Sequence, residues 1–414
     1  MSALSYPATP VDSLSQNMGL ARLVAYFAMF DLLLLPYFQL VILPFSLPVL
    51  LLAVLVLDTR IRNDSYLLLF GIVVAGVVLS LGASYFVSAS PEYLTDNAKR
   101  AFQVCSTFVY FFYFRWVARH APLDVRPLLR LFLAWFWILS IAFMLRPGAT
   151  GDFLRMVYGR LVSSEKQFAQ HLRFSYLFSD PNTAAYFLLV AASALLMAAR
   201  TLRAQVLLLT LLAPLVFLTQ SRGALMVYVL MGLVTIYPPR RLARTLLSVR
   251  RAGILLFVIV GLVAVLIYLK QSENEQFEAV QLAYERLFEA SSEEYLTGTS
   301  RTQIWERFTT SHLPLPLGRG YVLAVAGVAQ GPHSDVLRIT YAHGLIALVA
   351  IMLFFFRRLW AYPALILPAL MAFLINSLCD DQKLTALFLA LLGICIGQEE
   401  RLKAAAPPGP AHAP

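Results

Sequence analysis

Residues 204–238 read AQVLLLTLLAPLVFLTQSRGALMVYVLMGLVTIYP. Two apolar runs flank the polar turn Thr219-Gln-Ser-Arg222, and each run approaches the length at which a helix crosses a bilayer. Because so short a turn returns the chain at once, the runs predict two antiparallel membrane-spanning helices. Arg222 then lies at the membrane surface.

The composition extends this pattern over the whole chain of 414 residues. Hydrophobic residues make up 59% and charged residues 14%, whereas soluble domains carry about 25% charged residues. These values exclude a soluble globule and predict an all-α polytopic membrane protein. The net charge of +10 is spread over many loops, which argues against a nucleic-acid surface, and the three cysteines fit neither a disulfide framework nor a metal site.

Apolar runs predict about twelve transmembrane helices. Residues 1–270 contain the first nine and the polar segment 147–182, residues 271–333 form a large loop with short helices, residues 334–398 contain the last three, and 399–414 form a disordered tail. The predicted spans are 20–37, 38–57, 65–86, 100–117, 127–146, 183–199, 204–219, 222–238, 252–270, 334–356, 360–378 and 385–398.

Arginines set the predicted orientation, because cytoplasmic loops are enriched in Lys and Arg. Basic pairs and runs lie in alternate loops, which places both termini in the cytoplasm. Segment 147–182 and loop 271–333 then share the opposite face. A second set of arginines on that face indicates an anionic ligand there: Arg155, Arg160, Arg173, Arg222, Arg301, Arg307 and Arg319.

Helix start signals lie beside several of these residues. Ser300 and Gln303 form a capping box that places Arg301 in a helix first turn. Asp180-Pro181-Asn182 combines an N-cap acid with proline at the first helical position, so it starts the sixth span.

His333 is the candidate for proton transfer. It follows Gly331-Pro332 at the start of a span, where the helix dipole disfavours imidazolium, so we expect a neutral ring that can accept a proton. Alternatives remain for each residue taken alone. His333 could only cap or pack, Arg222 could snorkel toward lipid headgroups, and Arg173 and Arg301 could lie on solvated surfaces.

Taken together, these residues resemble the O-antigen ligase family, part of a wider group that includes O-antigen polymerases. The resemblance covers roughly residues 170–350, and Ser334 departs from the asparagine that many relatives carry after the histidine. The segments that carry it are Arg173-Phe-Ser-Tyr-Leu-Phe-Ser-Asp-Pro-Asn182, Thr219-Gln-Ser-Arg-Gly-Ala224, Ser300-Arg-Thr-Gln-Ile-Trp305 and Pro332-His-Ser-Asp-Val-Leu-Arg338, running on to Gly344-Leu345.

The resemblance implies a GT-C-like glycosyltransferase of the bacterial inner membrane with its active site facing the periplasm. The donor would be polysaccharide linked to undecaprenyl diphosphate. The acceptor would be lipid A-core, and membrane lipids would surround the protein. Arg222 and Arg301 would neutralise the diphosphate, and His333 would act as base in an inverting, metal-independent reaction without a cofactor. Arg173, Arg338, Trp305 and Asn182 are expected to bind diphosphate or substrate, and Arg155, Arg160 and Lys166 the acceptor phosphates.

Three alternatives stay open. A polymerase would use the same residues on a lipid-linked acceptor. A protein-directed oligosaccharyltransferase usually has a larger C-terminal region than this chain. A twelve-span transporter would need ionisable groups near the bilayer midplane and repeated halves; Asp31 is the clearest acid inside a span, and no repeat is evident.

Overall fold

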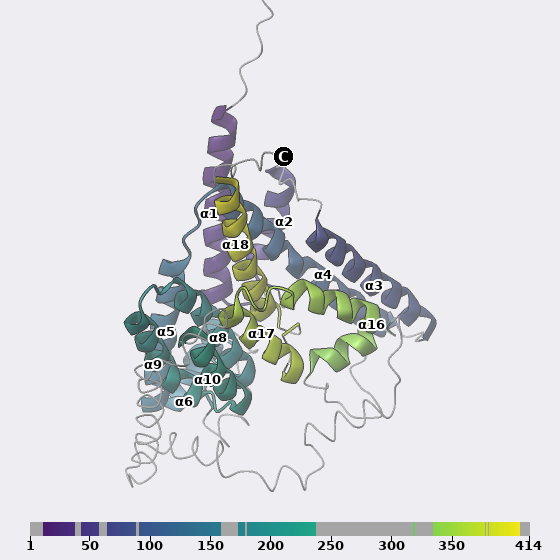
Figure 1. Ribbon diagram of the computed structural model, residues 1–414. Coiled ribbons are helices and arrows are strands. Elements are labelled where there is room, and N and C mark those ends of the chain that lie inside the picture. The colour runs from purple at the N-terminus through teal and green to yellow at the C-terminus, as the bar shows by residue number, and fades with distance from the viewer. Residues whose placement is uncertain are drawn as a thin grey trace, which may run out of the picture.

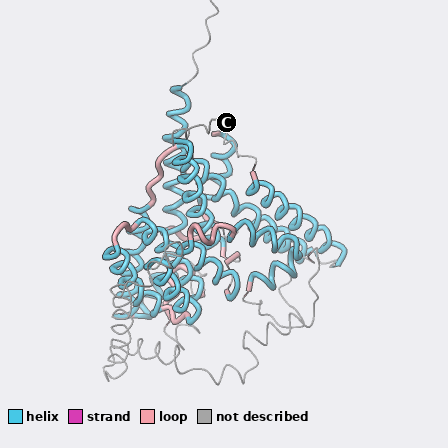
Figure 2. The backbone as a smooth tube through the Cα atoms, in the orientation of Figure 1, coloured by secondary structure: helices cyan, strands magenta, loops and turns pink. Residues whose placement is uncertain are grey.

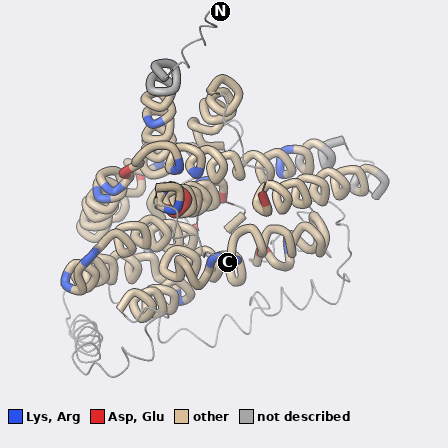
Figure 3. Tube along the Cα trace, turned by 45° about the horizontal axis from the view of Figure 1, so that its top comes forward, with Lys and Arg blue, Asp and Glu red and all other residues tan. Residues whose placement is uncertain are grey.

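A computed structural model shows that every regular element in the described part of the chain is a helix, joined by short loops (Figures 1 and 2). Long stretches of these helices carry no charged residue, as Figure 3 shows. The structure describes residues 11–37, 43–57, 64–87, 91–158, 173–178, 180–236, 318, 334–376, 378–379 and 381–405. The helices are α1 (Val11–Leu34), α2 (Ser46–Val56), α3 (Ser65–Val87), α4 (Pro91–His120), α5 (Arg126–Leu145), α6 (Pro147–Tyr158), α8 (Pro181–Ala198), α9 (Leu202–Leu218), α10 (Arg222–Ile236), α16 (Asp335–Phe356), α17 (Pro363–Ile375) and α18 (Gln382–Ala405).

Four described helices are long and apolar enough to cross a membrane: α5, α8, α16 and residues Ser65–Ala83 of α3. Helices α2, α9, α10 and α17 are apolar but have only 10–17 residues, whereas a straight crossing needs about 20. The structure therefore agrees with the predicted helical membrane protein but does not confirm twelve spans. The predicted span 252–270 lies outside the described residues.

Several helix bounds differ from the predicted ones, for local reasons. The predicted span 360–378 begins with a turn, and its helix starts only at Pro363, because proline suits the first position of a helix. Helix α4 already begins at Pro91 instead of residue 100. Helix α18 continues to Ala405 instead of ending at 398, so the predicted disordered tail is wrong for its first residues.

Helices α4 and α18 run side by side in the same direction and form the axis of the fold. At one end the Thr107 hydroxyl donates to Gln382 Oε1 (2.7 Å), and at the other Arg115 donates to Glu400. A side chain at Gly393 or Gly397 would collide with the α4 backbone, since an added Cβ would lie 2.5 Å from Phe111 O or 2.3 Å from Arg115 O. We call the two ends of this pair the Gln382 end and the Glu400 end.

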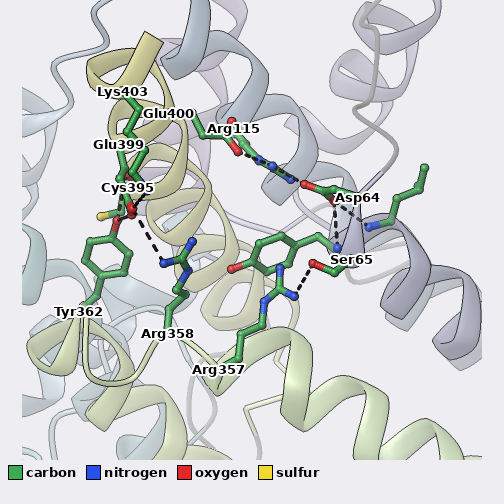
Figure 4. A network of polar contacts seen from close by, with 12 residues as sticks. Asp64, Ser65, Arg115, Arg357, Arg358, Tyr362, Cys395, Glu399, Glu400 and Lys403 are labelled. Carbon is green, nitrogen blue, oxygen red and sulfur yellow. Dashed lines mark hydrogen bonds and ion pairs between the residues drawn. The ribbon is translucent and has the colours of Figure 1, made fainter. Parts of the chain in front are cut away.

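A polar network ties four chain segments together at the Glu400 end (Figure 4). Arg115 on α4 pairs with both Asp64, just before α3, and Glu400 on α18. The guanidinium of Arg357, after α16, lies 3.3 Å from the centre of the Tyr66 ring. The network explains why α18 extends so far: its last turns are held by these pairs. It also brings together basic residues that the sequence predicts on one face.

Aromatic side chains fill the core beside this axis. Phe108 and Phe111 of α4 both contact Phe354 of α16, with ring centres 4.8 Å apart in each pair. A second cluster surrounds the buried segment 173–178, where Tyr176 contacts Phe136 of α5 at 5.0 Å. This cluster fixes the segment that carries Arg173.

Candidate functional site

The predicted site residues fall into two groups. Arg301, Trp305, His333, Arg160 and Lys166 lie outside the described residues. The structure places the other five, namely Arg155, Arg173, Asn182, Arg222 and Arg338.

Arg173 lies buried at the start of the non-helical segment 173–178. Its Nε donates to the backbone oxygen of Thr219 (3.2 Å), and its Nη2 donates to Oδ1 of Asn182 (3.1 Å). The neighbouring backbone N–H of Phe174 donates to Leu218 O (3.1 Å). Protein surrounds this non-helical segment, and these hydrogen bonds satisfy the backbone N–H of Phe174 and two nitrogens of Arg173. One arginine therefore joins the start of α8 to the end of α9.

Asn182 is itself held by the cap of α8. The Asp180 side chain accepts hydrogen bonds from the backbone N–H and from Nδ2 of Asn182, both at 2.9 Å. Pro181 occupies the first helical position, as the sequence predicts. With its Nδ2 fixed on Asp180, the amide presents Oδ1 to Arg173.

The turn between α9 and α10 presents Arg222 on the surface. Gln220 has a φ of 52°, a left-handed conformation that reverses the chain within the turn. Ser221 Oγ accepts from the N–H of Ala224 (3.4 Å) and caps α10, and Arg222 follows as an exposed first residue of that helix. Because Arg173 is bonded to Thr219 in the same turn, the structure brings Arg173, Asn182 and the base of Arg222 together.

Side-chain packing against Gly223 and a hydrogen bond to Asp335 connect this turn to the start of α16. A Cβ at Gly223 would lie 2.7 Å from both Ile375 Cδ1 and the Tyr186 hydroxyl, so α10 starts directly against the end of α17. A few residues further on, the N–H of Cys379 donates to Oδ2 of Asp335 (2.8 Å), the first residue of α16. Ile375 and Cys379 thus contact the segment with Arg222 and the helix with Arg338, respectively, and the sequence analysis did not identify these contacts.

A buried ion pair supports this end of the molecule. Lys383 and Asp31 have no exposed side-chain surface, and Nζ lies 3.6 Å from Asp31 Oδ1. Nζ also donates to the backbone oxygens of Asp31 and Leu35, both at 2.6 Å, while Asp31 Oδ2 accepts from the N–H of Ser46 (2.7 Å). Asp31 therefore holds α1 against α18 and α2. This structural role accounts for the acidic residue that was the main feature in favour of a transporter.

The remaining predicted residues lie on neighbouring helices. Arg155 is in the last turn of α6, with Nη1 3.9 Å from Asp152 Oδ1. The Tyr158 hydroxyl at the end of that helix donates to the backbone oxygen of Leu34 (3.3 Å), near the Lys383 pair. Arg338 lies in the first turns of α16 and lines a pocket with Arg100. Sequence reasoning missed Arg100, whose position as the first residue of the predicted span 100–117 was the available signal.

The chemistry of the described site is that of anion recognition. Arg222 and Arg338 lie in the first turns of α10 and α16, where the helix dipole favours negative charge. No group of three His, Cys, Asp or Glu side chains within the described ranges could hold a metal ion. Such a site can neutralise phosphate oxygens through nitrogen donors.

Comparison with known proteins covers the part of the site from the turn before Arg222 to Arg338. Residues 205–352 match the family model described as O-antigen ligase. This segment belongs to the O-antigen ligase family. The match includes Arg222, Arg301, His333 and Arg338, and it confirms the resemblance predicted from the sequence. A search among curated proteins returned no match.

Proposed function

We propose that the chain is an O-antigen ligase of the inner membrane, which transfers polysaccharide from undecaprenyl diphosphate to lipid A-core. One observation carries the proposal: Arg173 is bonded to the turn that presents Arg222, within an O-antigen ligase segment. Guanidinium groups at a membrane surface would suit a lipid-linked diphosphate. In this proposal the Gln382 end faces the periplasm.

In the proposed reaction, Arg222 and Arg301 neutralise the diphosphate. The acceptor hydroxyl oxygen attacks the anomeric carbon, the bond from that carbon to the diphosphate oxygen breaks, and the diphosphate leaves with the electron pair. His333 takes the hydroxyl proton. In-line displacement inverts the anomeric configuration, and charge stabilisation by arginines requires no cofactor.

The other predicted residues have supporting roles in this proposal. Arg173 and Asn182 hold the turn that carries Arg222, so they act by positioning. Trp305 contacts the sugar. Arg155, Arg160 and Lys166 bind phosphates of the lipid A-core acceptor, which is strongly anionic.

Lysine substitution tests the diphosphate role. Arg222→Lys keeps the charge but loses the bidentate fork, so we expect glycan transfer by purified protein to fall sharply while the thermal unfolding temperature is unchanged. Arg301→Lys should lower glycan transfer in the same way. Arg203→Lys, at an exposed position in the first turn of α9, is the control. Near-normal transfer by both site variants would show that these arginines do not bind the diphosphate and only contribute to membrane topology.

A histidine pair tests the base. Removal of a general base costs about 10²–10⁴ in rate, so His333→Ala should nearly stop transfer while leaving donor binding intact. His312→Ala, on the same predicted loop, should retain activity. Loss of transfer in His312→Ala together with retention in His333→Ala would contradict the assignment.

An O-antigen polymerase remains the second candidate, because the same family segment and arginines serve either acceptor. Supplying purified protein with lipid A-core or with a second lipid-linked oligosaccharide separates the two. In a deletion strain, accumulated lipid-linked polymer indicates a ligase, and single-repeat chains indicate a polymerase.

A further inference from the structure

Helix α16 is broken near its middle. Gly344 has a φ of 87° and a ψ of 170°, so the backbone leaves the helical conformation there and the helix changes direction (Figure 1). Residues 335–343 form a first half-helix, and residues 345–356 form the second. Sharp kinks in helices have local causes, and glycine is the residue that tolerates a positive φ. Gly344 therefore sets the break, and contacts on both sides of it fix its angle.

Helix α3 contacts both halves of α16. Before the break, His343 is only 5% exposed, with Nδ1 3.1 Å from the Ser80 hydroxyl. That hydroxyl donates to Val77 O (2.7 Å), so the ring nitrogen is the donor to Ser80. After the break, a Cβ at Gly76 would lie 2.9 Å from Ala347 Cβ. The two contacts are one turn apart on each helix, so one face of α3 holds α16 across its break.

The predicted large loop also touches this break. Gly318 is buried, and an added Cβ there would overlap the backbone oxygen and carbon of Ala342 and the backbone nitrogen of His343. A position so close to another backbone accepts glycine and excludes residues with a side chain. Residues 319–333 therefore start from the end of the first half-helix and lead back to its beginning at Ser334.

The beginning of the first half-helix is held separately. Asp335 Oδ2 accepts from the Cys379 N–H (2.8 Å), and His333 is two residues earlier in the chain. At 1.5 Å per residue the half-helix is about 12 Å long, so a tilt of about 5° at the break moves its beginning by about 1 Å. The angle of the break thus controls where the chain next to His333 lies.

We infer that the break in α16 is a joint that positions His333 for transfer. The members of the joint are Ser80, His343, Gly344 and Gly318. The chain on either side of His333 is anchored at this joint, on one side through residues 319–333 and on the other through the half-helix. Misplacement of a reacting group by about 1 Å can cost about 10²-fold in rate. The members are positioning residues, and their role rests on the proposed function.

Steady-state glycan transfer by the purified full-length protein tests the joint. Ser80→Ala removes the partner of the imidazole, so we expect kcat to fall about 10- to 100-fold. The KM for the donor should change by less than about 3-fold, because Arg222 lies on α10 and still binds the diphosphate. Ser193→Ala is the matched control and should keep the wild-type kcat. Ser193 is buried on α8, and its hydroxyl donates to Val190 O (2.6 Å), three residues back, as Ser80 does.

Two substitutions of His343 separate the hydrogen bond from the packing. His343→Asn keeps a nitrogen donor near the position of Nδ1 and should retain most of the wild-type kcat. His343→Leu keeps an apolar side chain without a donor and should match Ser80→Ala. An equal loss in both variants would overturn the joint, and so would a wild-type kcat in both Ser80→Ala and His343→Leu.

Gly318→Ala tests the contact from the loop. The added Cβ overlaps the α16 backbone and forces the joint open, so kcat should fall as in Ser80→Ala. Gly148→Ala is the control, with nothing within 4 Å of an added Cβ. Because both changes act on one joint, the double variant with Ser80→Ala should lie within about 3-fold of the worse single variant. Losses that multiply would show two separate contacts and overturn the joint.

A distance measurement tests the joint without transfer. With the native cysteines replaced by serine, spin labels at His333→Cys and at the exposed position Ala149→Cys report the distance between residue 333 and α6 by double electron–electron resonance. The distance distribution should shift or broaden in Ser80→Ala and Gly318→Ala but not in Ser193→Ala. An unchanged distribution in both joint variants, with normal transfer by wild type, overturns the joint and leaves the ligase. If wild type transfers no glycan but the distribution responds as expected, the joint stands and the ligase is wrong.

Discussion

Lys383 and Asp31 form the most deeply buried ion pair among the described residues, with no exposed side-chain surface on either partner. Loss of one partner leaves the other charge buried without compensation, which costs about 3–5 kcal/mol. Lys383→Met should therefore lower the unfolding temperature strongly, and Asp31→Asn in the same chain should restore much of it while keeping the bond to Ser46.

The matched control is Lys403→Met, which removes a lysine from an exposed pair with Glu399 on the same helix. Pairs of this kind contribute little to stability. If Lys383→Met is no more damaging than Lys403→Met, the buried pair does not hold α1 against α18.

Asp64 links stability to pH at the Glu400 end. Burial opposes its ionisation, but the hydrogen bond and charge of Arg115 prevail and lower the pKa of its carboxyl. A pKa lowered by folding stabilises the protein above the unfolded value of about 3.9, and this contribution is lost as pH falls through the folded value. Asp64→Asn should unfold at a lower temperature than wild type at pH 7, and the gap should close below about pH 4. A difference in unfolding temperature between Asp64→Asn and wild type that does not change with pH would contradict the role of Arg115. Asp152→Asn, which removes an exposed carboxylate, is the control.

At the scale of elements, the contact between α4 and α18 depends on Gly393 and Gly397. Small residues at this spacing, with three residues between them, let helix backbones approach closely in membranes. Gly397→Leu forces the helices apart, and overpacking of this kind costs at least about 1–3 kcal/mol. We expect a lower unfolding temperature and loss of transfer, because α18 also carries Lys383 and Gln382.

Gly71→Leu is the matched control for this prediction. Gly71 lies on an exposed face of α3, with nothing within 4 Å of an added Cβ. Equal stability of the Gly397→Leu and Gly71→Leu proteins would show that α4 and α18 are not packed as described.

For the whole molecule, the two ends should lie on opposite sides of the membrane. With the native cysteines replaced by serine, a cysteine at Ala149 on α6 should react with an impermeant thiol reagent in cells with permeabilised outer membranes. A cysteine at Arg203 should not react until the inner membrane is opened. Both positions are exposed in the structure. The reverse pattern would place the arginine site in the cytoplasm and contradict the ligase.

The sequence by itself determined the helical membrane class, the start of α8 at Asp180-Pro181 and the placement of Arg115 and Arg357 at one end. These properties depend on local hydropathy, caps and charge, so neighbouring residues encode them. Only the tertiary structure decided that Arg173 supports the turn before Arg222, that Lys383 neutralises Asp31, and that Arg100 and His343 share a pocket with Arg338. These contacts join residues that are far apart in the chain. Their free energy depends on how the helices pack, and this packing leaves no local pattern in the sequence.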